Sequence, residues 1–216
     1  MLDVTPAERR PRGPHAAVRH PSRAGGAEGN RRLTGATAAV LVALLAAEGV
    51  TVLAIQPLLS MHVFIGMLLI PPVVLKLAST GYRFVRYYTG APVYRAEGPP
   101  NPLLRLLAPV VVLSTAALFA SGVALIVLGR SHGPVLGLHK ASFVVWFAAT
   151  TAHVLGHALR VPALAVADWR RNDRLPGSGV RRWLLAASIV AGLILAFSTV
   201  HLAGSWAHAH YSSLAR

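Results

Sequence analysis

The stretch LLAPVVVLSTAALFASGVALIVLG, residues 106–129, runs for 24 residues without a single charged side chain. An α-helix rises about 1.5 Å per residue, so a run of this length crosses the roughly 30 Å hydrocarbon core of a bilayer. The run shows no alternation of polar and apolar residues, which argues against the short strands of a membrane β-barrel. This stretch therefore predicts a transmembrane helix.

Four further apolar runs of similar length lie along the chain. Together with the first, they predict five transmembrane helices, at about residues 34–56, 58–80, 106–129, 136–159 and 183–205. The composition agrees: 54% of the 216 residues are hydrophobic, 13% are charged, and the mean hydropathy is +0.55. These values suit a membrane protein better than a water-soluble domain. The predicted fold is an all-α integral membrane bundle of five helices.

The segments outside the predicted bundle are polar. Residues 1–33 are rich in Pro, Gly and Arg and lack apolar periodicity, so we predict a disordered, Arg-rich cytoplasmic tail there. Residues 34–205 form the predicted transmembrane domain, and residues 206–216 form a short external C-terminal tail. The first apolar run begins late and has spanning length, which distinguishes it from a cleaved signal peptide.

The basic residues are concentrated on one predicted side of the membrane. Of the 21 Lys and Arg residues, 17 lie in residues 1–33, 81–105 and 160–182. The positive-inside rule then predicts a multi-pass plasma-membrane protein with a cytoplasmic N-terminus and an extracytoplasmic C-terminus. Because these arginines flank membrane helices, the net charge of +14 indicates contact with membrane lipid and not with nucleic acid.

Five of the ten histidines lie within the predicted helices or at their edges. At 1.5 Å per residue, His62, His139 and His201 come within about one turn of the outer boundary, each from a different helix. His153 follows His139 by 14 residues, about 21 Å deeper and on nearly the same helix face. His157 shares that face one turn further on. Ionisable residues inside a membrane are rare and indicate functional sites.

Paired histidines on facing helices suit a bound haem b, because each neutral imidazole offers one nitrogen to the iron. The outer level predicts one haem held by two of His62, His139 and His201. A second, inner haem rests on His153, since the residue 14 positions after His62 is Lys76, whose ammonium group is expected to reach the inner headgroups. The chain contains no cysteine, which excludes covalent c-type attachment.

Three further polar residues lie near the predicted outer level. Glu48, in the first predicted helix, is a candidate proton acceptor for a quinol, or a protonated carboxyl group bonded to a neighbouring helix. Lys140 and Arg130 lie where the propionates of an outer haem would point. Ordinary anchoring at the membrane interface explains both cations equally well.

Two stretches carry a resemblance to known proteins. MHVFIGMLLIPPVVLKLASTGYRFVRYYTG (61–90) and GLHKASFVVWFAATTAHVLGH (137–157) look like a group of actinobacterial cytochrome b-like membrane proteins. Histidines 14 residues apart also resemble the cytochrome b subunits of hydrogenases and formate dehydrogenases, and ferric-reductase-type transmembrane domains. The resemblance implies haem b on His62 and His139, with His153 as the inner candidate. It also implies an electron-transfer subunit working between the quinone pool and a partner oxidoreductase.

Two other functions remain open. A proton or metal transporter would use Glu48, Lys76 and the histidines as a pathway, with polar groups at several depths along one continuous path. A scaffold without haem would use the histidines for interhelical hydrogen bonds alone. The clustering of histidines at one level favours electron transfer over transport.

Overall fold

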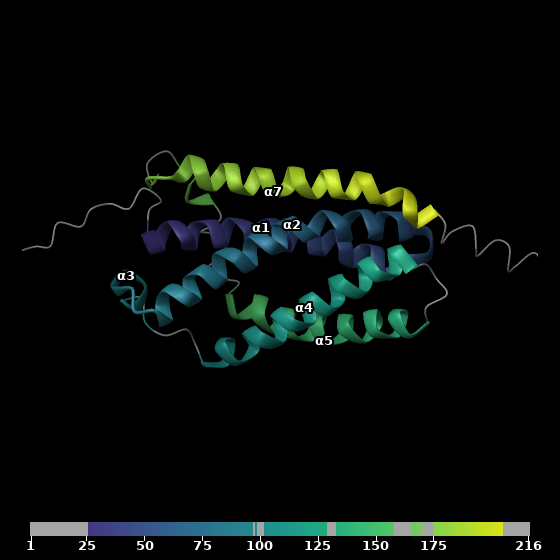
Figure 1. Ribbon diagram of the computed structural model, residues 1–216, viewed down its shortest axis with the longest axis horizontal. Helices are drawn as coiled ribbons and strands as arrows, with labels where there is room; N and C mark the ends of the chain where they lie inside the picture. Colours follow the sequence, from purple (N-terminus) through teal and green to yellow (C-terminus); the bar gives the residue numbers. More distant parts are fainter. Residues whose placement is uncertain are drawn as a thin grey trace, which may run out of the picture.

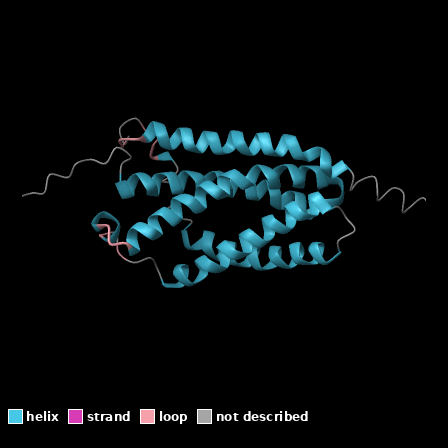
Figure 2. Ribbon diagram, viewed as in Figure 1, coloured by secondary structure: helices cyan, strands magenta, loops and turns pink. Residues whose placement is uncertain are grey.

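The computed structural model describes residues 26–96, 98, 102–128, 133–157, 166–168, 170 and 175–204. The predicted external tail and the first 25 residues of the predicted N-terminal tail lie outside this described part. Its long helices are α1 (Gly26–Leu53), α2 (Ile55–Tyr88), α4 (Pro102–Leu128), α5 (Gly133–His157) and α7 (Ser178–Thr199) (Figure 1). The described residues add the short helices α3 (Pro92–Arg95) and η2 (Val200–Ala203) and contain no strand (Figure 2).

All five long helices are long and apolar enough to cross a membrane. The predicted all-α fold is therefore confirmed, and the helices indicate a multi-pass membrane protein. Each predicted span falls within one of these helices, apart from a few residues at the ends of some spans.

Helix α1 spans Gly26–Leu53, so residues 26–33, which precede the predicted apolar run, are helical. Polar contacts stabilise the additional turns, because Glu28 pairs with Arg31 at 3.2 Å and with Arg32 at 3.0 Å. Residues three and four apart share one face of a helix, which allows such pairs. Hydropathy identifies the lipid-embedded part of a helix but does not detect a polar extension of this kind.

Helix α2 has 34 residues and is about 51 Å long, well beyond the thickness of a hydrocarbon core. Pro71 and Pro72 lie inside it, and neighbouring membrane helices and local adjustments of the backbone can satisfy the groups that proline frees. After α2 the chain turns at Gly90, whose φ of 87° is readily adopted by glycine. Helix α3 then folds back, and its buried Tyr94 joins a cluster with Ala27.

The long helices form two units. Helix α2 packs against α1 and α7, whereas α4 packs mainly against α5. Figure 1 shows α7, α1 and α2 in its upper half and the α4 and α5 pair below them. We call the first three the three-helix unit and the pair the two-helix unit. Few residues of α2 and α4 contact each other directly. Side chains that reach from one unit to the other therefore contribute to how the two units pack together.

A close crossing of α2 and α7 holds the three-helix unit together. Ser188, Gly192 and Ala196, spaced four residues apart, are buried along one face of α7. A Cβ atom built on Gly192 would lie 2.4 Å from the carbonyl oxygen of Leu68 in α2. Small residues at this spacing let two membrane helices approach closely, and glycine is required at the closest point.

Because the five long helices alternate in direction, each end of the bundle gathers one terminus from all of them (Figure 1). We call one end the histidine end; it contains Leu53, Ile55, Leu128, Gly133 and Thr199. We call the opposite end the arginine end; it contains Gly26, Tyr88, Pro102, His157 and Ser178. In Figure 1 the histidine end lies to the right and the arginine end to the left.

Candidate functional site

Two of the candidate histidines face each other at the histidine end. The imidazole rings of His62 in α2 and His139 in α5 have centroids 6.4 Å apart and an interplanar angle of 84°. Both side chains are partly buried. They belong to different units, so this contact bridges the three-helix and the two-helix units. The structure thus brings together two of the three histidines expected at one level.

The surroundings of His62 determine which of its ring nitrogens carries the proton. Its Nδ1 lies 2.9 Å from Oε1 of Glu48 and 3.0 Å from Oγ1 of Thr51. Thr51 donates its hydroxyl hydrogen to the main-chain carbonyl of Glu48 at 2.6 Å, so its oxygen can only accept from the ring. With Glu48 ionised, both neighbours of Nδ1 are acceptors, and Nδ1 is then the N–H donor.

The Nδ1 atom of His139 also lies between two hydrogen-bond acceptors. Its Nδ1 lies 3.1 Å from the carbonyl oxygen of Leu118 and 3.1 Å from Oγ of Ser121. A carbonyl oxygen can only accept, and Ser121 already donates its hydrogen to the carbonyl of Ala117 at 2.7 Å. Close helix approach makes these contacts available, because a Cβ atom on Gly122 would lie 3.2 Å from Cε1 of His139. His139 is therefore also protonated on Nδ1.

In their neutral form, both rings then carry a lone pair on Nε2. Within the described part of the chain, neither Nε2 has a hydrogen-bond donor. An imidazole whose Nδ1–H is held by a carboxylate or a carbonyl, with Nε2 left as an acceptor, is the form in which histidine binds metals. With Nδ1 as the donor, both rings have this form.

The separation of the rings fits two imidazoles on opposite sides of one metal ion. Bonds between metals and imidazole nitrogen are about 2 Å long, which puts the two ring centroids about 6 Å apart. Among the described residues no group of three or more His, Cys, Asp and Glu side chains is positioned to hold a metal ion.

The other candidates for the outer site lie elsewhere. His201 is in η2 and is exposed; the chain leaves the α-helical course after Thr199, and the tighter 3₁₀ winding changes the direction in which later side chains project. Lys140 follows His139 in α5 and is exposed. Arg130 lies outside the described residues. The structure therefore leaves the histidine end with His62 in contact with both Glu48 and His139.

The candidates for an inner site come from two different units. Nζ of Lys76 donates to the carbonyl oxygen of Thr34 in α1 at 3.0 Å, so the ammonium group binds a neighbouring helix; its depth relative to the lipid headgroups stays a prediction. His153 is partly buried on α5, in the two-helix unit. The backbone of His157 ends α5, and its side chain lies outside the described part. Lys76 thus has a structural partner of its own.

An apolar hollow of about 140 Å³ lies between α2 and α4. Its lining includes Ile70 and Val73 of α2 and Phe119 of α4, and Thr115 is the one polar side chain among the described residues that line it. Thr115 is already engaged, since it donates to the carbonyl of Val111 and accepts from the indole N–H of Trp146 at 3.0 Å. The hollow can therefore take an apolar group and offers no hydrogen bond of its own.

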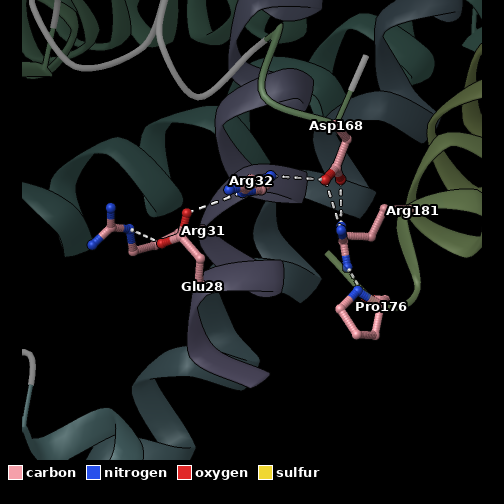
Figure 3. A network of polar contacts seen from close by, with 6 residues as sticks. All are labelled: Glu28, Arg31, Arg32, Asp168, Pro176 and Arg181. Carbon is pink, nitrogen blue, oxygen red and sulfur yellow. Dashed lines mark hydrogen bonds and ion pairs between the residues drawn. The ribbon is translucent and has the colours of Figure 1, made fainter. Parts of the chain in front are cut away.

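The arginine end contains a polar network that the sequence did not reveal (Figure 3). Asp168, which precedes α7, accepts hydrogen bonds from Nε and Nη2 of Arg181, the latter at 2.7 Å. Arg32 of α1 reaches the same carboxylate at 3.4 Å, and Arg181 also donates to the carbonyl of Pro176 at 2.9 Å. Asp168 therefore ties the beginnings of α1 and α7 together.

This network affects the ionisation of its carboxylate. Burial by itself raises the pKa of Asp168, but the hydrogen bonds and positive charge of Arg181, followed by those of Arg32, outweigh burial and hold the pKa below its usual value. The sequence signal was present but weak: Asp168 is one of two acids in a strongly basic segment between two spans. Neither periodicity nor spacing indicates which arginine it meets.

Comparison of the chain with models of protein families, with curated proteins and with solved structures found no match. The interpretation of the histidine end therefore rests on its own geometry.

Proposed function

We propose that the chain is a membrane electron-transfer subunit of the cytochrome b type, which holds one haem b between His62 and His139. One observation carries the proposal: both rings donate from Nδ1 to protein acceptors, so two Nε2 lone pairs are left at a ring separation of 6.4 Å. Bis-histidine ligation of this kind suits a low-spin haem that transfers electrons.

In this function the protein fixes the orientation of the two histidine rings that would bind the haem. Glu48 and Thr51 fix the ring of His62, and Leu118 and Ser121 fix that of His139. Haem, when bound, supplies a one-electron couple. Because the ligands come from both units, binding would also tie the two-helix unit to the three-helix unit.

The surrounding residues support an apolar cofactor. The hollow lined by Ile70, Val73 and Phe119 begins about two helical turns from His62 along α2. Phe119 also directly follows Leu118, whose carbonyl binds His139. Apolar surface beside the two ligands suits a macrocycle and disfavours a hydrated metal ion, which would require polar groups.

The proposed setting follows from the charges and from the position of the pair. The three sequence segments that carry 17 of the basic residues adjoin or include the helix termini of the arginine end, so the positive-inside rule assigns that end to the cytoplasm of a plasma membrane. The histidine pair then lies near the extracytoplasmic face. Quinol, which gives up two electrons and two protons, is the proposed donor, and a partner oxidoreductase is the proposed acceptor that takes the electrons one at a time.

An absorption spectrum of the purified full-length chain tests this proposal. The chain should be red, with a Soret band and a reducible α band, and a pyridine haemochrome assay should give about one haem b per chain. A colourless protein after expression with sufficient haem would contradict the proposal. Such a protein that moved protons or metal ions in liposomes would be a transporter, and one without either property would be a scaffold.

A further inference from the structure

Glu48 is a carboxylate inside a membrane-spanning helix. Its side chain is 15% exposed and contacts His62 and Thr51. Within the described part of the chain, no lysine or arginine lies within ion-pair distance of it; its ionisable partner is His62. A buried carboxylate is costly unless a positive charge or several hydrogen bonds compensate it. When ionised, Glu48 places a negative charge at the histidine end that no described lysine or arginine side chain balances.

The two ligands differ in what holds their Nδ1–H groups. His62 donates to a carboxylate, whereas His139 donates to the main-chain carbonyl of Leu118. A carboxylate acceptor draws the proton more strongly and makes the opposite nitrogen a better electron donor to a metal. The environment thus makes His62 the more strongly donating ligand of the two.

We infer that Glu48 is a positioning residue that favours the ferric over the ferrous state of a haem bound to His62. The inference rests on the proposed function and deepens it. Ferric iron carries one more positive charge than ferrous iron, so a negative carboxylate one imidazole away stabilises the oxidised state more than the reduced state. The charge of Glu48 therefore sets a low reduction potential for the site.

The test compares midpoint potentials of the haem-loaded full-length protein by spectroelectrochemical titration. Glu48→Gln keeps an acceptor at nearly the same place and removes the charge. Changing a residue that hydrogen-bonds a metal-ligating histidine typically costs about 10-fold to 100-fold in metal affinity, so we expect at least a tenfold loss in the preference for ferric haem. For a one-electron couple, a tenfold change corresponds to a shift of about 59 mV, here to a more positive potential.

Glu28→Gln is the matched control, because it makes the same chemical change on the same helix at the opposite end of the bundle, and it should leave the potential unchanged. Equal potentials in Glu48→Gln and the wild type, with haem bound in both, would overturn the inference and leave the proposed function intact. A wild-type protein without haem would instead overturn the proposed function and the inference with it.

A second variant covers the case in which Glu48→Gln does not fold or does not retain haem. Glu48→Asp keeps the charge and shortens the side chain by one methylene group. We expect the midpoint potential of Glu48→Asp to stay nearer to the wild-type value than to the more positive value expected for Glu48→Gln. A positive shift of about 59 mV or more in Glu48→Asp would show that the charge does not set the potential and would overturn the inference.

Discussion

Among the described residues, each end of the bundle contains a carboxylate that is buried or partly buried, and the two carboxylates meet different partners. At the arginine end, Asp168 accepts hydrogen bonds from Arg181 and Arg32. At the histidine end, Glu48 accepts from the ring of His62. A guanidinium group is always charged and binds a carboxylate through paired hydrogen bonds, whereas an imidazole with its proton on Nδ1 is neutral and has a second nitrogen to offer.

The difference shows that the basic side chain paired with a carboxylate determines whether the pair stabilises the fold or can take part in ligand binding. Arg181 satisfies both oxygens of Asp168, so that network is complete and ties α1 to α7. The network at Glu48 is incomplete, because it ends at His62, whose Nε2 has no hydrogen-bond donor among the described residues. We therefore expect changes at the arginine end to alter stability, and changes at the histidine end to alter ligand binding.

The largest effect on stability should come from Asp168→Ala. The change leaves the 6%-exposed Arg181 side chain without its carboxylate, and removing one partner of a buried ion pair costs about 3–5 kcal/mol. Thermal unfolding in detergent, followed by circular dichroism, should show a clearly lower midpoint. Glu28→Gln is the control, since its exposed pairs are worth about 0–1 kcal/mol. Equal midpoints in the two variants would mean that the arginine end is not the stabilising one.

A smaller effect on stability is expected where α2 and α7 cross, between the two ends of the bundle. In Gly192→Ala the new methyl group would meet the carbonyl oxygen of Leu68 at 2.4 Å, which forces the helices apart and costs about 1–3 kcal/mol. Gly81→Ala is the matched control, because nothing lies within 4 Å of its added Cβ atom and alanine favours a helix. If Gly192→Ala unfolded at the same temperature as the control, the close crossing would be wrong.

The smallest effect should be the response of the arginine end to acid. Asp168 has a lowered pKa in the folded chain and about 3.9 in an unfolded one. Its carboxylate therefore stabilises the fold above about pH 4, and this contribution is lost as the pH falls through the lowered pKa. Unfolding midpoints measured from pH 6 to pH 3 should fall more steeply for the wild type than for Asp168→Asn. Parallel curves would contradict this assignment.

The five membrane-spanning helices could be predicted because hydropathy and length alone decide that a segment crosses a bilayer. The polar start of α1 could not, since the Glu28 pairs that stabilise it lie outside the apolar run. The contact of Lys76 with Thr34 was also missed, because it depends on which face of α2 meets α1. Spacing within one helix says nothing about its neighbour.

The histidine pair could be predicted in part. Counting the helical rise puts His62 and His139 at one depth, and the structure brings their rings together. The same count includes His201, which the 3₁₀ turn of η2 leaves exposed. The carbonyl of Leu118 as the partner of His139 has no signature in the sequence, because every residue carries a carbonyl group. It is nevertheless the contact that fixes the proton on Nδ1.

The haem content of four alanine variants tests the central claim most directly. Pyridine haemochrome assays on purified His62→Ala, His139→Ala, His153→Ala and His201→Ala should be compared with the wild type at equal protein concentration. The first two remove a ligand and should lower the haem content by at least about tenfold. The last two should retain about one haem per chain with an unchanged α band. Loss of haem from His153→Ala, or full retention in His62→Ala, would contradict a site built from His62 and His139.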